Sequence, residues 1–547
     1  SNTPYETQQI YRIVSVGNYN LKKHFENFEM KLEIKLFIVL VSAVTVCFGQ
    51  QYKDWTWSES SPLDDYVNRP DDTYDWTVLN TYRIDTDLDD QEDCTTFVVN
   101  MTSQTWLNES YSSQPIWWHH LIIAIPDNVI DYEHGLVFIN GGSNRIPDTP
   151  PDPDNDFGVN AISLAATEIQ AVAALLKQNP NQPVTMPIAP DPTQRRSEDS
   201  IIAVTWRYFL ETNGTDPDVL LRNPMTKAVM RAFDTITTLT TQHNTRFNIQ
   251  KFLPAGASKR GWTTWMVACV DRRVFAMAPI VLSVLKFHET VSSHYRAYGG
   301  WSFAFGSYWV ENITQFLNDP RTQMMADIVD PYSYRSRLTM PKMVVQAAGD
   351  EFFRPDEPNF WFNDLIGPKY MWVIENTHHG LTFAEPALFF NIAAFFKATS
   401  KNDVLPVFNW TLSQDAANRT GTIDVYTNQQ VPVSVSAWYA ETADGGPGGE
   451  VRRDFRWARA SETPGEIEEN PVLWSEDVNA VEVIVPDRHF RATFAEPSSG
   501  WLGFFLEVVF TNSDGDEMEF TTELNVIPAR YPFPACTTPE NCWGRIV

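Results

Sequence analysis

Three residues whose types can together activate a nucleophile lie far apart in this chain: Ser258, Asp350 and His379. A serine hydroxyl becomes reactive when a histidine takes its proton and an acid orients that histidine. The serine follows the apolar run "FLPAGA", the aspartate follows "MVVQAAG", and the histidine follows "MWVIENTH". The chemistry that such a set performs is acyl transfer to water, as in the hydrolysis of ester or peptide bonds.

The order serine, acid, histidine, with each residue on a loop after a strand, matches the α/β-hydrolase arrangement. For the histidine we favour His379, which precedes a glycine at the turn into the next helix; His378 is then a neighbour that contacts solvent or substrate. For the acid, Asp350 is closest to the strand end, and Glu351 and Asp356 remain alternatives. Two simpler interpretations also exist, because serine is a common helix N-cap and aspartate often forms a turn after a strand.

The negative charge that such a reaction develops on oxygen needs backbone N–H groups aimed at it. One is expected from Lys259, directly after the serine, where a helix would begin. The other is expected from the region of Gly142 and Ser143, after the run "LVFIN", because small residues let the backbone approach closely. The glycines there are also compatible with an ordinary turn.

The turn around Ser258 departs from the G-x-S-x-G pattern of a sharp strand-to-helix turn. Arg260 stands where a small residue is usual, and Gly261 comes one position later. Two arrangements are compatible with this spacing: Arg260 points outward and pairs with an acid near the site, or the turn is more relaxed than catalysis requires. We therefore include Arg260 and His378 among the candidate substrate-binding residues.

Two further features are candidates for substrate binding. Glu198 and Asp199 form an acidic pair that can hold a cationic amine, although the helix dipole also favours carboxylates at a helix start. The segment from about residue 288 to 330 is rich in aromatic residues and includes "YRAYGGWSFAFGSYW". We expect it to form a cap whose rings either line a substrate pocket or cover the sheet.

Strands and helices that alternate along the chain must position these residues. Strand-like runs occur at 94–106, 117–126, 134–142 and 201–210, and before each of the three candidate catalytic residues. Apolar residues spaced by three and four predict a helix from Ile162 to Lys177. This alternation predicts an α/β fold with a mostly parallel sheet, which carries its site at the carboxyl ends of the strands. We assign residues 50–398 to this α/β-hydrolase domain.

The pattern changes after about residue 398. Segments such as "GTIDVYTNQQVPVSVSAWYAET" and "NAVEVIVPDRHFRATF" alternate apolar and polar residues with period two, and an Asp-Gly pair at 514–515 predicts a hairpin. Several short strands of this kind predict a C-terminal β-sandwich of immunoglobulin or fibronectin type over residues 399–547, with a tail at its end. We expect this domain to serve packing or partner contact.

The beginning of the chain predicts export. From Met30, two lysines precede the apolar run Leu36–Phe48, and small residues follow, which is the layout of a signal peptide over residues 30–49. This run of thirteen residues is too short to span a bilayer, so we expect no stable membrane insertion. Residues 1–29 look like a non-native upstream extension. We therefore predict a secreted, extracellular protein.

Sequons and cysteines agree with this compartment. N-x-S/T sequons for glycosylation stand at Asn100, Asn108, Asn213, Asn312, Asn409 and Asn418. Cys536 and Cys542 bracket a short loop, and we favour a disulfide between them. Cys269 is expected to be a buried thiol, and the partner of Cys94 stays open.

Charge and composition limit the classes of partner. The net charge of −28 argues against nucleic acid, which needs a basic surface. The sequence has no CxxC pair and no histidine cluster, so we predict no metal and no cofactor. The expected partners are a peptide or ester substrate, or a cell-surface receptor.

Longer motifs give the chain a family resemblance. "PLDDYVNRPDDTYDW", "FINGGSN", "SEDSIIAVTW", "GASKRGWTTW", "VDPYSYRSRLTMPK" and "GDEFFRPD" make it similar to the PhoPQ-activated pathogenicity-related proteins, a family that includes autocrine proliferation repressors. The resemblance implies a secreted α/β-hydrolase core followed by a β-rich domain, and the G-x-S-K-R-G form is the family's own version of the turn. It leaves two functions open: a secreted serine hydrolase with a Ser-Asp-His triad, or a signalling or binding protein on a hydrolase scaffold.

Overall fold

The structure is a computed structural model, and it describes residues 52–145, 149–382, 384–428, 430–443, 449–461, 463, 465–470 and 472–547. Residues 53–547 form one compact unit. The predicted upstream extension and signal peptide, residues 1–49, lie outside the described residues. Among the helices in the described ranges, none combines the length and the apolar character needed to cross a membrane.

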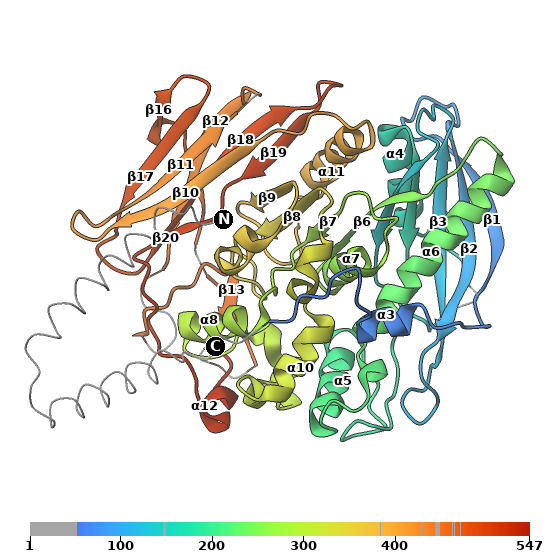
Figure 1. Cartoon of the computed structure of the whole chain (residues 1–547), viewed down its shortest axis with the longest axis horizontal. Coiled ribbons are helices and arrows are strands. Elements are labelled where there is room, and N and C mark those ends of the chain that lie inside the picture. Colours follow the sequence, from blue (N-terminus) through green and yellow to red (C-terminus); the bar gives the residue numbers. More distant parts are fainter. Residues whose placement is uncertain are drawn as a thin grey trace, which may run out of the picture. The chain divides into compact units, whose positions relative to one another are not determined.

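The core is a long twisted sheet whose middle strands are parallel (Figure 1). Its first nine strands run in the order β1-β2-β3-β5-β4-β6-β7-β8-β9, and every neighbouring pair from β5 to β9 is parallel. The strands are β1 (Asp75–Ile84), β2 (Cys94–Thr105), β3 (Ile116–Pro126), β4 (His134–Ile139), β5 (Val172–Leu176), β6 (Lys251–Ala257), β7 (Ala278–Ile280), β8 (Lys342–Ala347) and β9 (Lys369–Ile374). This is the predicted α/β-hydrolase core.

Helices cover both faces of this sheet because neighbouring residues of each buried strand point to opposite sides. On β6, Phe252 stacks on Phe233 of α6 with ring centroids 4.1 Å apart. The next residue, Leu253, belongs instead to the apolar core that contains residues of α4 and α11. The helices of the two faces are α4 (Phe157–Ile169) and α11 (Glu385–Ser400) on one side, and α6 (Arg222–His243) and α7 (Lys259–Val270) on the other.

Two sequence-based assignments were wrong. The predicted helix Ile162–Lys177 ends at Ile169, and β5 occupies its second half. Gln170 adopts a left-handed conformation with φ of 53°, which stops the helix, and β5 is buried on both faces and therefore shows no period of two. The strand-like run 201–210 belongs instead to α5 (Asp199–Glu211), whose apolar residues are buried in the helix.

The C-terminal region forms the predicted antiparallel β-sandwich. One sheet has the order β10-β11-β17-β16, and the other contains β19-β18-β12-β15. Phe494 of β17 packs on Phe504 of β18 with centroids 4.8 Å apart, so the inner faces meet. These strands are β10 (Phe408–Asp415), β11 (Thr420–Thr427), β12 (Ser434–Glu441), β15 (Ser475–Asp477), β16 (Val481–Val485), β17 (His489–Ala495), β18 (Leu502–Thr511) and β19 (Glu517–Thr521).

The sandwich continues the hydrolase sheet. Strand β19 lies beside β9, where Thr521 pairs with Met371 and its hydroxyl accepts the N–H of Val373 at 3.1 Å. The proposed division near residue 399 falls at the end of α11. The two regions are therefore joined through one sheet as well as through the chain.

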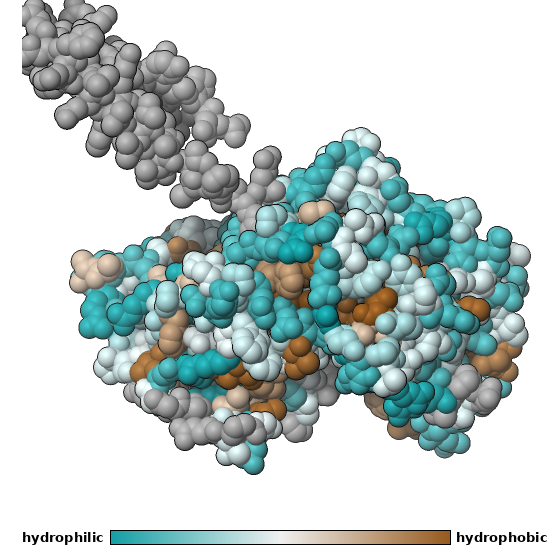
Figure 2. Space-filling view, turned by 90° about the horizontal axis from the view of Figure 1, so that it is seen from below, coloured by the Kyte–Doolittle hydropathy of each residue, from teal (hydrophilic) through white to brown (hydrophobic). Residues whose placement is uncertain are grey.

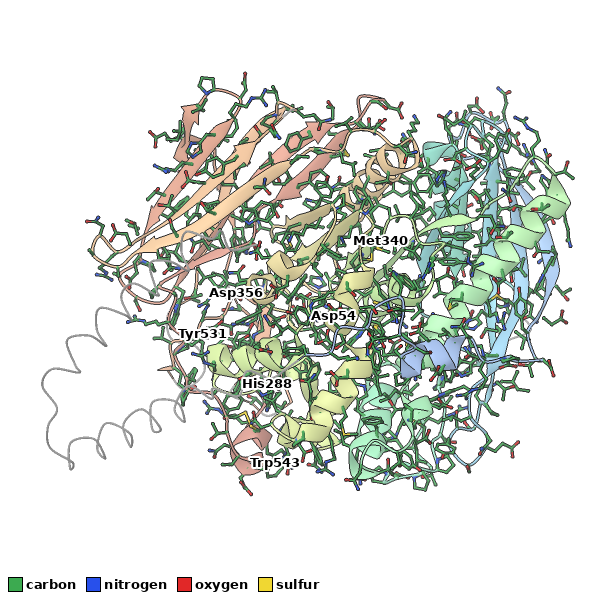
Figure 3. The ribbon with its side chains drawn as sticks, viewed as in Figure 1. Asp54, His288, Met340, Asp356, Tyr531 and Trp543 are labelled. Carbon is green, nitrogen blue, oxygen red and sulfur yellow. A yellow bond between two sulfur atoms is a disulfide. The ribbon has the colours of Figure 1, made fainter. Side chains whose placement is uncertain are left out.

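The segment predicted as a cap consists of short helices that the C-terminal tail holds in place. These helices are α8 (Phe287–Tyr298), α9 (Gly306–Val310) and α10 (Pro320–Val329). Trp301 donates its indole N–H to the carbonyl of Cys542 at 2.8 Å. Trp309 stacks on Trp543, which is labelled in Figure 3 and ends α12 (Pro539–Trp543). The disulfide Cys536–Cys542 is present, and Cys94 and Cys269 are buried thiols.

Among the described residues, the side of the molecule that Figure 2 shows is mainly hydrophilic. Apolar residues appear there in small separate groups between hydrophilic areas. The six sequon asparagines are all exposed, although they come from different strands and loops. Their exposure is compatible with glycosylation at these positions, which remains a prediction.

Candidate active site

Ser258 stands on a sharp turn between β6 and α7. Its φ of 59° and ψ of −125° place an L-residue in the positive-φ region, which costs on the order of 1–3 kcal/mol. Its hydroxyl makes no capping bond to α7, although Ser258 holds the N-cap position. The side chain is thus held away from the helix, which excludes the N-cap interpretation and the relaxed turn.

The turn tolerates Arg260 because the crowded position is Gly261. A Cβ at residue 261 would lie 2.6 Å from the carbonyl oxygen of Ile280 and 2.9 Å from that of Gly256. Gly256 in turn leaves room for the backbone of Arg260, whose carbonyl oxygen would lie 2.9 Å from a Cβ there. The Arg260 side chain is only 12% exposed, so it does not point outward, but it binds the carboxylate of Glu198 at 2.7 Å, which is the pairing with a nearby acid that the first predicted arrangement included.

Ser258, His379 and Asp350 meet at the carboxyl ends of β6, β9 and β8. The Ser258 hydroxyl lies 2.8 Å from Nε2 of His379, and Nδ1 of His379 lies 2.9 Å from each carboxylate oxygen of Asp350. The Asp350 side chain is 2% exposed and that of His379 is 16% exposed. These distances allow a hydrogen bond at each step, and the one between Ser258 and Nε2 of His379 is within the range that proton transfer requires.

The acid and the histidine are each held by a second contact. The backbone N–H groups of Phe352 and Phe353 donate to Oδ1 of Asp350 at 2.7 and 3.0 Å. The backbone N–H of His379 donates to Glu351 at 3.0 Å, and the ring of Phe352 lies 4.4 Å from the imidazole centroid. Burial raises the pKa of Glu351. The imidazole is thus fixed at its ring nitrogens and at its backbone.

The alternative residues have other partners. Nδ1 of His378 accepts the N–H of Gly380 at 2.9 Å, and its ring centroid lies 6.3 Å from that of Trp457. Asp356 is buried and bound to Arg453, in a charged cluster next to Tyr531 (Figure 3). The geometry therefore brings together His379 and Asp350, and neither His378 nor Asp356.

Of the predicted N–H donors, the one on Lys259 is better placed. Lys259 is the first residue of α7, where backbone N–H groups have no partner inside the helix. Gly142 has a φ of 149°, and its loop touches the turn through Gly141, because a Cβ at Gly141 would collide with the guanidinium of Arg260. The hydroxyl of Ser143 accepts the N–H of Arg145 at 3.2 Å, and neither Gly142 nor Ser143 lines the cavity described below.

The acidic pair is already neutralised. The Lys259 ammonium lies 2.9 Å from Glu198 and 3.1 Å from Asp199, and Arg260 binds the other oxygen of Glu198. The hydroxyl of Tyr308 also donates to Asp199 at 3.0 Å. Burial alone would raise the pKa of Glu198, but the charges of Lys259 and Arg260 outweigh it and lower the pKa to about 2. A substrate amine would therefore have to displace existing partners.

Glu198→Gln is expected to destabilise the turn in a pH-dependent way. Because the pKa of Glu198 is about 2 in the fold and ordinarily 4.5, its stabilising effect is complete above about pH 5 and is lost as the pH falls toward 2. Solvent screens part of it, since 37% of the side chain is exposed, and we expect a loss of about 1 kcal/mol at pH 7. Urea unfolding from pH 7 to pH 3 measures this difference.

The matched control is Glu211→Gln, which removes an exposed i,i+4 ion pair with Arg207 on the same helix. We expect less than about 0.5 kcal/mol from that change. A Glu198→Gln effect that is equally large at pH 3 would show that the carboxylate charge is not its cause.

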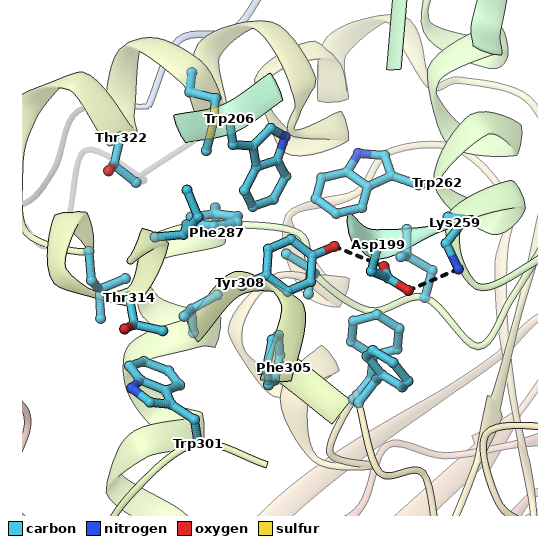
Figure 4. A pocket seen from close by; sticks show the side chains of 18 of the residues that line it. Asp199, Trp206, Lys259, Trp262, Phe287, Trp301, Phe305, Tyr308, Thr314 and Thr322 are labelled. Atoms are coloured by element: carbon cyan, nitrogen blue, oxygen red, sulfur yellow. Dashed lines mark hydrogen bonds and ion pairs between the residues drawn. The ribbon is translucent and has the colours of Figure 1, made fainter. Parts of the chain in front are cut away.

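An aromatic cavity of about 60 Å³ opens beside Ser258. Figure 4 shows Trp206 and Trp262 on one side of it and Trp301 and Phe305 on the other, with the hydroxyl of Tyr308 directed at Asp199. A cavity of this size holds a few water molecules or a short side chain. The segment predicted as a cap supplies much of its wall, so its rings line a pocket.

Several residues of this site could not be predicted from the sequence. Phe352 and Phe353 stand in the loop after Asp350, where nothing local distinguishes them from ordinary apolar residues. Arg222 lines the cavity although it begins a helix 36 positions before Ser258. Of the four predicted substrate-binding residues, only Asp199 lines the cavity.

The fold and this geometry define a protein built on the α/β-hydrolase scaffold with serine, histidine and aspartate in hydrogen-bond contact. The chain belongs to the PhoPQ-activated pathogenicity-related protein family, whose model matches residues 63–456. It is 34% identical over 493 residues to autocrine proliferation repressor protein A of Dictyostelium discoideum, an alignment that covers 88% of this chain and 94% of that protein.

Solved structures with a similar chain path include two esterases. An acetyl xylan esterase from Paenibacillus sp. R4 has a TM-score of 0.40 at 15% identity, covering 62% of this chain and 95% of the esterase. A glucuronoyl esterase from Solibacter usitatus has a TM-score of 0.36 at 11% identity, covering 65% and 96%. Similarity at this level says nothing about substrate.

Proposed function

We propose that this protein is a secreted serine hydrolase that cleaves ester or peptide bonds. The observation that carries the proposal is the continuous contact from the Ser258 hydroxyl through His379 to the buried Asp350. The strained turn at Ser258 supports it, because such strain is usually kept only where a function needs it.

In this mechanism Ser258 attacks the substrate carbonyl while Nε2 of His379 takes its proton. Asp350 holds the imidazole with Nδ1 protonated and stabilises the positive charge that forms on the ring. The oxyanion receives the N–H of Lys259 and a second N–H from the region of Gly142. His379 then gives its proton to the leaving group, and a water molecule repeats the sequence to release the acid.

The location and the chain's division belong to the same proposal. A signal peptide over residues 30–49, a hydrolase domain over 50–398 and a sandwich over 399–547 fit an exported protein. The disulfide Cys536–Cys542 and the exposed sequon asparagines support that location. The contacts of the tail with Trp301 support a role for the C-terminal region in shaping the pocket.

The test is labelling of the purified wild-type protein with a fluorophosphonate, followed by a panel of short acyl esters and peptides. We expect stoichiometric labelling of one serine and turnover of at least one ester. Absence of labelling in protein that unfolds cooperatively would contradict an activated serine and with it the hydrolase proposal.

The alternative is a secreted signalling or binding protein on this scaffold. It is favoured by one observation, the 34% identity to a protein named autocrine proliferation repressor. The two functions predict different outcomes for an inactive variant. If a growth-repressing activity survives the loss of Ser258, that activity does not need hydrolysis.

A further inference from the structure

Three residues that line the cavity beside Ser258 each have a buried polar group without a hydrogen-bond partner in the part of the chain that the structure describes. These groups are Nε of Arg222, Nε1 of Trp206 and the hydroxyl of Thr314. Arg222 is 1% exposed, Trp206 is 3% exposed and Thr314 is 8% exposed. Two of these groups donate only, and a buried donor without an acceptor costs about 1–3 kcal/mol, so a ligand that supplies an acceptor would recover that free energy.

The cavity wall also carries an excess of positive charge. Its lining residues that carry a charge at neutral pH are the cations Arg222 and Lys259 and the acid Asp199. Asp199 is already bound to Lys259 at 3.1 Å and to the hydroxyl of Tyr308 at 3.0 Å (Figure 4). Burial lowers the pKa of Arg222 to about 10, so its guanidinium is still charged at neutral pH.

This positive charge lies close to the reacting serine. Nη1 of Arg222 donates to the carbonyl of Lys259, the residue after Ser258, at 3.1 Å. The guanidinium also stacks over the ring of Trp262 at 4.2 Å, which fixes its position. The N-terminus of α7 begins at the same residue and adds a partial positive charge. A negative group bound here would therefore lie within on the order of 10 Å of the Ser258 hydroxyl.

Building on the proposed hydrolase function, we propose that the substrate's acyl group carries a carboxylate, which Arg222 binds in the cavity. The cavity would thus bind an anionic group of the substrate and not the cationic amine predicted for Glu198 and Asp199, because both acids are already paired with cations. The volume of about 60 Å³ suits an acyl group with a short chain. The substrate class is a monoester or monoamide of a short dicarboxylic acid.

The test compares 4-methylumbelliferyl succinate, which keeps a free carboxylate, with its methyl ester, which is neutral. We expect the wild-type protein to prefer the free acid by at least about tenfold in kcat/KM, the size of a charge-assisted hydrogen bond. Arg222→Met should lower this ratio by about ten- to a hundredfold, and Arg222→Lys should retain part of it. The exposed Arg246 supplies the control, since Arg246→Met should leave the ratio at the wild-type value. A wild-type protein that turns over both esters equally, or prefers the neutral one, overturns the proposal.

Calorimetric titration of succinate into Ser258→Ala protein separates this proposal from the hydrolase function. It needs no turnover, so it remains decisive if neither ester is cleaved and the hydrolase proposal itself fails. We expect succinate to bind and its dimethyl ester not to bind, and we expect Arg222→Met to abolish binding in the same background. If succinate does not bind, or binds as well after Arg222→Met, the carboxylate site is refuted.

Discussion

Ser258→Ala is expected to abolish fluorophosphonate labelling and to lower kcat for any cleaved ester by on the order of 10⁶-fold. The serine supplies the atom that forms the covalent bond, and no neighbouring group replaces it. Nε2 of His379, 2.8 Å away, would then face a methyl group. The measurement is kcat for the best ester of the panel, with labelling as an independent readout.

A second variant at the same position separates reactivity from stability. Ser258 makes no capping bond and has a φ of 59°, so its removal costs the fold little. Ser258→Gly should be as inactive as the alanine variant. It should also be more stable than the wild-type protein by about 1 kcal/mol, because glycine adopts positive φ without strain. A glycine variant less stable than wild type would argue against strain at the nucleophile, and an alanine variant that keeps activity would exclude Ser258 as the nucleophile.

The sequence was informative about the candidate catalytic residues because each of them has a recognisable local context. An apolar run that ends in a small residue or an acid marks the carboxyl end of a buried strand, and parallel strands bring such ends to one edge. This is why Ser258, Asp350 and His379, which span 121 positions, could be predicted to lie together. The sandwich was predictable for a similar reason, since its strands alternate polar and apolar residues.

The sequence was less informative where burial hides the periodicity. Strand β5 is buried along its whole length, and its Ala- and Leu-rich residues suit a helix as well as a strand. The sequence could not decide whether the turn accommodates Arg260, because this depends on the close approach of Gly261 to Ile280 in the folded chain. Arg222 at the start of α6 contacts Lys259 at the start of α7, and no short-range sequence pattern predicts a contact between two separate helices.

The wall of the pocket depends on the most distant contacts. Trp301 lines the cavity, and its indole is held by the carbonyl of Cys542, 241 positions away. A sequence pattern does not relate a cap residue to a tail residue, since neither has an unusual local context. The positions of the candidate catalytic groups are therefore set by the sheet, while the shape of the cavity beside them is set by packing that only the three-dimensional structure displays.

Asp350→Asn is expected to lower kcat by about 10⁴-fold while the fold stays intact. The amide oxygen can still accept the N–H groups of Phe352 and Phe353, so the loop keeps its support. Its NH₂ group, however, would donate to Nδ1 of His379 and leave the proton on Nε2, where the serine proton must go. The rate of ester cleavage measures this loss, and the thermal unfolding midpoint confirms that the variant is folded.

The matched control for this change is Glu351→Gln, at the adjacent acid. Glu351 accepts the backbone N–H of His379, and a glutamine oxygen can do the same, so we expect less than about a tenfold loss in kcat. If Asp350→Asn lowered kcat no more than Glu351→Gln did, the contact of Asp350 with the imidazole would have a structural role and would not be needed to keep the proton on Nδ1. A large loss of kcat for Asp350→Asn alone would show that the two acids have different roles, because only the group that contacts Nδ1 determines which ring nitrogen carries the proton.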